Sequence, residues 1–179
     1  MLEKGRPEDF KQRLDKEKRV YDLLDQLNIE YERIDHGSTM TMEECLEIEK
    51  ELDAMICKNL FLVNSNKSQY YLFMLRGDKK FKTKDVSKQI QSSRLSFADD
   101  DKMLEYLDIT PGSVSVMGLM NDIDNHVQLI VDEDILLEEY IGFHPCINTT
   151  SMKIKTADLF EKVLTHIHHD YMKVTVKHS

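Results

Sequence analysis

The stretch that most constrains this chain is residues 142–150, which read Gly-Phe-His-Pro-Cys-Ile-Asn-Thr-Thr. Strand-like segments, 139–143 and 151–155, flank it on both sides. Pro145 fixes its own φ and biases His144 toward an extended backbone, so covalent geometry sets the direction of the imidazole. Gly142 permits a close approach that a side chain would block. The sequence therefore predicts a rigid turn between two strands, serving either as an ordinary proline turn or as a site of binding or chemistry.

Length and composition favour a single globular domain. The chain has 179 residues, with 41% hydrophobic and 32% charged residues, which is enough to bury a core without staples. No apolar run approaches the roughly 20 residues that a membrane span needs, and the first ten residues lack the apolar core of a signal peptide. Three scattered cysteines, Cys45, Cys57 and Cys146, do not suggest a disulfide framework. We therefore expect a cytoplasmic protein.

Charge placement is more informative than the net charge of −9. Residues 76–94 carry seven basic and only two acidic side chains, a local excess of +5. The basic ones are Arg76, Lys79, Lys80, Lys82, Lys84, Lys88 and Arg94. Such a patch can follow a phosphate backbone. The alternative is an ordinary solvated helix start with scattered lysines.

Periodicity predicts interleaved helices and strands around a mixed sheet, the pattern of an α+β fold. Helical spacing covers 10–28, 41–53, 83–91, 98–107 and 156–168, with caps at Thr41 and Thr156 and a helical turn at 134–137. Strand patterns cover 29–34, 55–63, 69–75, 114–117, 127–131, 139–143, 151–155 and 172–176. Residues 1–9 are polar and are expected to be loose.

Lys58 stands out because it lies within an otherwise apolar strand pattern, Met-Ile-Cys-Lys-Asn-Leu-Phe-Leu-Val. A charge in such a place usually has a partner or a ligand. An ammonium group at the rim of a pocket can hold a phosphate or a carboxylate. An edge-strand lysine that discourages aggregation is the alternative.

Other chemical arrangements are weaker. His166, His168 and His169 lie close in sequence, but no carboxylate or thiol completes a zinc spacing, so we expect no metal. A Cys146 nucleophile served by His144 would lack an orienting partner. His36 and His126 have no supporting constellation and are interpreted as surface or core residues. Neither a Walker loop nor a dinucleotide fingerprint occurs.

Four segments in order carry a resemblance that covers residues 11–176. They are Cys-Lys-Asn-Leu-Phe-Leu at 57–62, Ser-Arg-Leu-Ser-Phe-Ala at 93–98, Thr-Pro-Gly-Ser-Val at 110–114, and Gly-Phe-His-Pro at 142–145 followed by Asn148 and Thr150. In this pattern the chain resembles the YbaK/ProX family, stand-alone relatives of the editing domain inserted in bacterial prolyl-tRNA synthetases. The resemblance implies a single compact α+β domain with a mixed, partly barrel-like β-sheet surrounded by helices, in which residues 10–176 form the editing domain.

The resemblance also implies the activity and the site. The activity is hydrolysis of a mischarged aminoacyl-tRNA, most plausibly alanyl-tRNA(Pro), without a cofactor. The tRNA(Pro) acceptor end is the expected partner, and prolyl-tRNA synthetase is a further candidate. Catalytic roles fall on Lys58, Gly112, Gly142 and His144; substrate contacts on Asn59, Ser113, Val114, Pro145, Asn148 and Thr150; and tRNA contacts on Lys79, Lys80 and Arg94.

The chain departs from the family pattern in two places. Many relatives carry a lysine where this chain has Val63, and of the Pro-Phe-Gly that often follows Gly-Ser-Val only Gly118 remains. Three other functions stay open on sequence alone. They are a non-catalytic sensor of aminoacyl-tRNA or of an amino acid, an editing enzyme for cysteinyl-tRNA(Pro), and a metal-dependent hydrolase that uses the terminal histidines.

Overall fold

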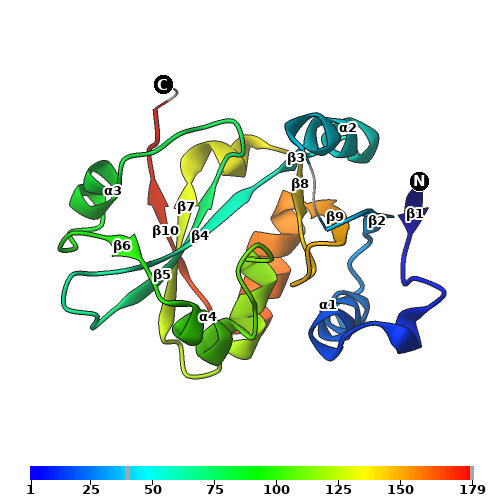
Figure 1. Cartoon of the computed structure of the whole chain (residues 1–179), viewed down its shortest axis with the longest axis horizontal. Helices are drawn as coiled ribbons and strands as arrows, with labels where there is room; N and C mark the ends of the chain where they lie inside the picture. The colour runs from blue at the N-terminus through cyan, green and yellow to red at the C-terminus, as the bar shows by residue number, and fades with distance from the viewer. Residues whose placement is uncertain (39–40, 178–179) are drawn as a thin grey trace.

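The computed structural model describes residues 1–38 and 41–177, and its strands form two five-stranded sheets (Figure 1). Sheet A has the order β1 (Leu2–Lys4), β2 (Glu32–Asp35), β9 (Thr150–Lys155), β8 (Tyr140–Phe143), β3 (Met55–Ile56). Sheet B has the order β10 (Tyr171–Val174), β7 (Val127–Asp132), β5 (Tyr70–Leu75), β4 (Lys58–Val63), β6 (Ser96–Phe97). Each sheet combines parallel and antiparallel pairs. The α+β class is therefore confirmed, with the expected mixed sheet divided in two.

Helices pack around these sheets. They are α1 (Asp15–Gln26), α2 (Met42–Leu52), α3 (Thr83–Gln89), α4 (Asp100–Leu107) and α5 (Leu164–His166), with short 3₁₀ helices at Phe10–Gln12, Val116–Asn121 and Glu133–Leu137 and a π-helix at Asp158–Val163. Figure 1 shows α3 beside sheet B at the left and α2 at the top, near β3 and β8. α2 starts as its sequence predicts: Thr41 accepts the Glu44 N–H, and the Glu44 carboxylate accepts the Thr41 N–H. Such a cap stabilises a helix by about 1 kcal/mol.

The β4–β5 hairpin follows from alternation and turn chemistry. The Asn64 carboxamide accepts the backbone N–H groups of Ser68 and Gln69, which closes the turn between the two strands. Successive β4 side chains point to opposite sheet faces. Phe61 and Val63 enter the main core, which also contains residues of α1 and sheet A. Leu60 and Leu62 enter a second, smaller core that includes Val86 and Ile90 from α3 and the residue after it.

Three expectations about local structure are corrected. Leu2–Lys4, expected to be loose, pairs with β2 as an edge strand. The valines of 114–117 suggest a strand, but Ser115 accepts the Met117 N–H and caps a 3₁₀ helix instead. The helix that follows β9 is not capped by Thr156, whose buried hydroxyl has no hydrogen-bond partner among the described residues.

Candidate active site

The two sheets meet at Cys57, where the chain leaves β3 and begins β4. β3 runs parallel to β8, with Ile56 opposite Gly142. The Cys57 N–H continues this pairing by donating to the Gly142 carbonyl at 3.0 Å. The next residue, Lys58, already pairs with β5 in sheet B. Lys58 therefore directly follows the residue that is hydrogen-bonded to β8, and β8 leads into His144.

Lys58 is exposed at the start of β4. Its ammonium group donates to the Lys79 carbonyl at 3.0 Å, which extends the side chain toward the loop after β5. Alternation places Asn59 on the opposite, main-core face of the strand. There the Asn59 amide donates to the Cys57 carbonyl at 3.4 Å. This hydrogen bond indicates that Asn59 stabilises the junction between the two sheets. Lys58 is the exposed charged side chain at this junction.

Gly142 is buried at the junction, and a side chain would not fit there. A Cβ atom would lie 2.9 Å from Ile56 Cγ1, 3.3 Å from Ile56 Cα and 3.3 Å from Leu52 Cδ2. Its carbonyl is already used by Cys57. The close approach expected from the sequence is thus an approach of β3 and α2, and this position argues against contact between Gly142 and substrate.

His144 begins the histidine loop, residues 144–149, which joins β8 to β9. Its Nδ1 lies 2.9 Å from the Thr150 carbonyl. Because a carbonyl only accepts, Nδ1 carries the proton and Nε2 keeps a free lone pair in the neutral ring. Burial lowers the pKa of His144 below the ordinary histidine value, and the charge of His36 lowers it further, against the opposing effect of the Thr150 hydrogen bond. The imidazole is therefore held neutral and oriented.

Thr150 is completely buried, so the expectation that it binds substrate is corrected. Its hydroxyl donates to Asp35 Oδ1 at 2.7 Å. Arg13 bridges the same carboxylate through both terminal nitrogens, at 3.1 and 3.0 Å, and also contacts Glu17 at 2.9 Å. Burial raises the pKa of Asp35, but the hydrogen bonds from Arg13 and Thr150 outweigh it and leave that pKa lowered. Thr150 therefore acts as a positioning residue, because its carbonyl orients His144 while Asp35 holds its hydroxyl.

The tip of the histidine loop lies beside the glycine turn after α4. Gly112 has φ +89°, and a Cβ built there would lie 3.8 Å from Asn148 Nδ2. Ser113 and Pro145 are buried, and Val114 packs against the main core. Of these residues, Gly112 is exposed, and Asn148 and Val114 are half-buried, with Val114 turned to the core. The structure thus places the Gly112 turn beside the histidine loop, and the segment that leads into Lys58 beside β8, the strand that enters this loop.

Lys79 is not available for RNA. Its side chain is 0% exposed and its ammonium group donates to Asp132 at 3.0 Å, to Asp134 and to the Val176 carbonyl at 2.8 Å. Burial lowers the pKa of Lys79, but the hydrogen bonds to Asp134 and Asp132 raise it more, so the lysine stays charged. Lys80 and Arg94 are exposed as expected. Arg94 lies just before β6, at the opposite end of β4 from Lys58, which is about 17 Å along the strand.

The surroundings of Cys146 and of the three histidines within residues 166–169 bear on the nucleophile and metal alternatives. Cys146 is buried, and burial raises the pKa of its thiol to about 12, which argues against a Cys146 nucleophile. His169 lies 3.1 Å from Asp122 in the interior, whereas His166 and His168 are exposed. Within residues 1–38 and 41–177, no group of three or more His, Cys, Asp or Glu side chains could hold a metal ion.

Sequence reasoning missed His36, which the structure places beside His144. The ring centroids are 6.2 Å apart, edge to face. His36 Nε2 lies 2.8 Å from the Ser151 hydroxyl, and its backbone N–H donates to Thr149. The strand pairing of β2 with β9 creates this contact. Only the position of His36, two residues after the predicted strand 29–34, hinted at it.

Comparison with known proteins identifies the family. The model of the aminoacyl-tRNA editing domain matches residues 36–162, which is more than half of the chain. The chain belongs to the aminoacyl-tRNA editing domain family. Removal of an amino acid from tRNA breaks an ester bond, so this editing domain is a hydrolase of the aminoacyl-tRNA deacylase class.

Named relatives agree with this assignment. The editing domain is 34% identical over 151 residues to prolyl-tRNA editing protein ProX of Acetoanaerobium sticklandii, covering 84% of this chain and 92% of that protein. It is 32% identical over 149 residues to prolyl-tRNA synthetase associated domain-containing protein 1 of Mus musculus, covering 80% and 88%. A solved structure described as a candidate trans-editing enzyme for prolyl tRNA synthetase matches with a TM-score of 0.66 at 16% identity, covering 94% and 100%. The resemblance inferred from the four motifs is confirmed.

One further observation concerns the helices. Among the described residues, none forms a helix long and apolar enough to cross a membrane.

Proposed function

We propose that the protein is a cytoplasmic trans-editing enzyme that removes alanine from mischarged tRNA(Pro). The observation that carries this proposal is the junction at Cys57, whose N–H bonds to Gly142 and whose next residue is the exposed Lys58, so that the lysine begins its strand next to the one that enters the histidine loop. Family membership supplies the reaction class, and the name of the bacterial relative points to prolyl-tRNA.

The aminoacyl ester is already activated, so the site needs orientation and charge stabilisation more than a strong nucleophile. Lys58 holds the phosphate of the terminal nucleotide. The neutral Nε2 of His144 takes a proton from the attacking water, either directly or through the ribose hydroxyl of the terminal adenosine. The water oxygen bonds to the ester carbonyl carbon, the bond from that carbon to the ribose oxygen breaks, and the proton passes to the departing ribose oxygen. Backbone N–H groups near Gly112 stabilise the developing oxyanion.

Selectivity against proline follows from exclusion. Favourable binding of one extra methylene discriminates by only about 1–3 kcal/mol. We assign the wall that admits the alanyl group and rejects the larger ring to Asn148 and the Gly112 turn, which lie side by side. The correct product therefore survives.

A deacylation panel with alanyl-, cysteinyl- and prolyl-tRNA(Pro) tests this function. We expect fast release of alanine and release of proline at the buffer rate. Lys58→Ala should lower kcat/KM for alanyl-tRNA(Pro) by about 10- to 100-fold, because a charge-assisted hydrogen bond contributes roughly 1.5–3 kcal/mol. Lys155→Ala, at another exposed lysine, is the matched control. Binding of the tRNA without release of any amino acid would establish the sensor instead, and preferred release of cysteine would change the substrate.

A further inference from the structure

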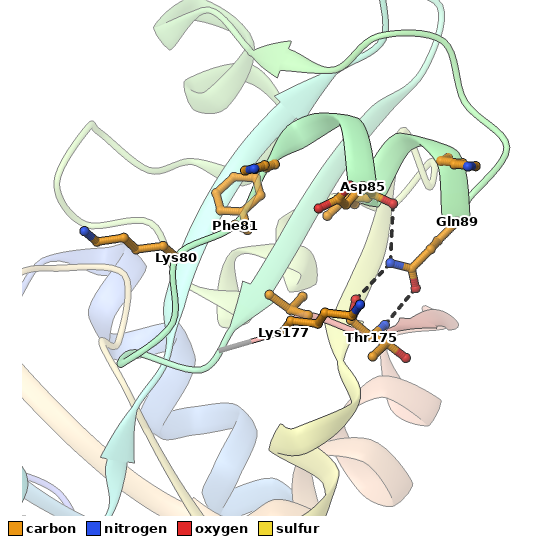
Figure 2. Close-up of a pocket in the computed structure, with 10 residues that line it drawn as sticks. Lys80, Phe81, Asp85, Gln89, Thr175 and Lys177 are labelled. Atoms are coloured by element: carbon orange, nitrogen blue, oxygen red, sulfur yellow. Dashed lines mark hydrogen bonds between the residues drawn. The ribbon is translucent and has the colours of Figure 1, made fainter. Parts of the chain in front are cut away.

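A groove of about 700 Å³ lies between α3 and the chain that follows β10, on the sheet B side of the molecule (Figure 2). Four lysines line it with a single described carboxylate, Asp85. These lysines are Lys80, Lys82, Lys88 and Lys177. In a chain with a net charge of −9, this concentration of positive charge is local, and it favours a polyanionic occupant.

The groove is held in shape by hydrogen bonds between its two walls. Figure 2 shows the Gln89 carboxamide bridging to Thr175: it donates to the Thr175 carbonyl at 2.8 Å and accepts the Thr175 N–H at 2.8 Å. Beneath one end, buried Lys79 donates to the Val176 carbonyl. Lys79 thus stabilises the groove without entering it, and a preformed site loses little entropy when it binds.

One end of the groove is adjacent in the chain to the residue that Lys58 contacts. Lys58 donates to the Lys79 carbonyl at 3.0 Å, and the next residue, Lys80, lines the groove. A chain of phosphates that begins at Lys58 therefore meets positive charge when it continues past Lys80.

The packing of Phe81, which lines the groove, indicates whether the groove suits a base-paired stem or a single strand. Recognition of single strands uses aromatic rings on which bases stack. Phe81 instead packs edge to face against Phe73, with centroids 5.3 Å apart, and lies half-buried against the second core. The lysines of the groove consequently offer contacts to backbone phosphates without a stacking platform.

We infer that this groove binds the phosphate backbone of the tRNA acceptor stem, while Lys58 holds the 3′ end. The inference rests on the proposed function, since it assigns a second contact to the same substrate. An acidic segment of a partner protein would also match the charge. The position of Lys80 next to the residue that Lys58 contacts favours the RNA.

The test compares a triple variant, Lys82→Glu, Lys88→Glu and Lys177→Glu, with a control of equal charge change, Lys11→Glu, Lys155→Glu and Lys173→Glu. The control lysines are exposed and lie outside the groove. Binding of uncharged tRNA(Pro) is measured from 50 to 200 mM salt, and deacylation is measured with alanyl-tRNA(Pro) and with a short alanyl-CCA trinucleotide.

For the groove variant we expect at least a tenfold rise in Kd for tRNA at 50 mM salt and a salt slope reduced by about 2 to 3, one step per lost phosphate contact. The KM for full tRNA should rise, whereas the rate with alanyl-CCA should equal that of the unchanged protein. Unchanged tRNA affinity, or an equal loss in the control, would overturn the inference and leave the groove to a protein partner. Absence of deacylation in the unchanged protein would instead contradict the proposed function, and the binding data would still decide the groove.

Discussion

His144 shows how one side chain acquires a defined proton state from its backbone surroundings. The Thr150 carbonyl fixes the proton on Nδ1, and the interior disfavours a second proton. Thr150 itself is locked by Asp35 and Arg13, whose side chains come from β2 and from the turn before α1. In the proposed mechanism, the orientation of His144 therefore depends on the ion pair between Arg13 and Asp35.

The lowered pKa of His144 predicts an acid-resistant enzyme. Since the ring stays neutral below the ordinary histidine pKa of about 6.5, kcat/KM should remain constant through pH 6.5 and fall only at more acidic pH. His144→Asn keeps a donor for Thr150 but removes Nε2. We expect this variant to lose about 10- to 100-fold in rate and to show no acid limb.

Single-turnover deacylation of alanyl-tRNA(Pro) from pH 5 to 8, corrected for spontaneous hydrolysis, measures both effects. An unchanged thermal midpoint for His144→Asn serves as the folding control. A variant that retained the full rate and the same pH profile would show that His144 only shapes the turn.

At the scale of elements, the site depends on the point where β3 and β8 part. Two parallel strands approach closely enough for Ile56 to cover Gly142, and Leu52 of α2 fills the space above them. This contact orients the start of β4, and with it Lys58. A change in the packing of α2 or β3 should therefore be felt at the active site.

Gly142→Ala tests this coupling. The new methyl group would lie 2.9 Å from Ile56 Cγ1, so β3 must shift, and overpacking of this kind costs about 1–3 kcal/mol of unfolding free energy. We expect a matching loss in urea denaturation and a lower kcat/KM for alanyl-tRNA(Pro). Gly37→Ala is the control, because among the described residues no atom beyond its chain neighbours lies within 4 Å of the added Cβ.

A second substitution separates packing from chemistry. Ile56→Ala removes the closest atom, and in a double-mutant cycle it should restore part of the stability and activity lost in Gly142→Ala. Stability that is restored while activity stays low would indicate a direct role of the Gly142 backbone in catalysis, contrary to its buried position.

For the whole molecule, local patterns were sufficient for most helices and strands but not for long-range contacts. The capping box at Thr41 and the strands at 58–63 and 70–75 follow from neighbouring residues. Lys79 and Lys80 look alike in sequence, yet Asp132, 53 positions away, draws only the first into the interior. Placing His36 beside His144 likewise required the pairing of β2 with β9. Such pairings depend on tertiary packing, which periodicity does not encode.

A buried carboxylate couples global stability to pH. Asp122 is 2% exposed and accepts the N–H groups of His126 and Val127 at 3.0 and 2.8 Å, and it contacts His169 beyond the C-terminal helix at 3.1 Å. Burial raises the pKa of Asp122, but these partners outweigh it and leave that pKa below the ordinary value. The unfolded chain then binds a proton more readily than the folded one. The stabilisation is therefore present above about pH 4 and is lost as pH falls through the folded pKa.

Asp122→Asn should lower the free energy of unfolding by about 1–3 kcal/mol at pH 7, because an amide donor replaces one acceptor facing a backbone N–H. The difference from the unchanged protein should shrink as pH falls below the ordinary aspartate pKa toward the lower pKa of the folded state, because protonation then removes the advantage of the native carboxylate. Urea denaturation at pH 3, 5 and 7 measures this trend, and Asp124→Asn, at an exposed neighbour, is the control. A difference that stayed constant over this range would mean that shape rather than charge makes Asp122 important. The contact between Asp122, before β7, and His169, after α5, would then stabilise the fold independently of proton binding.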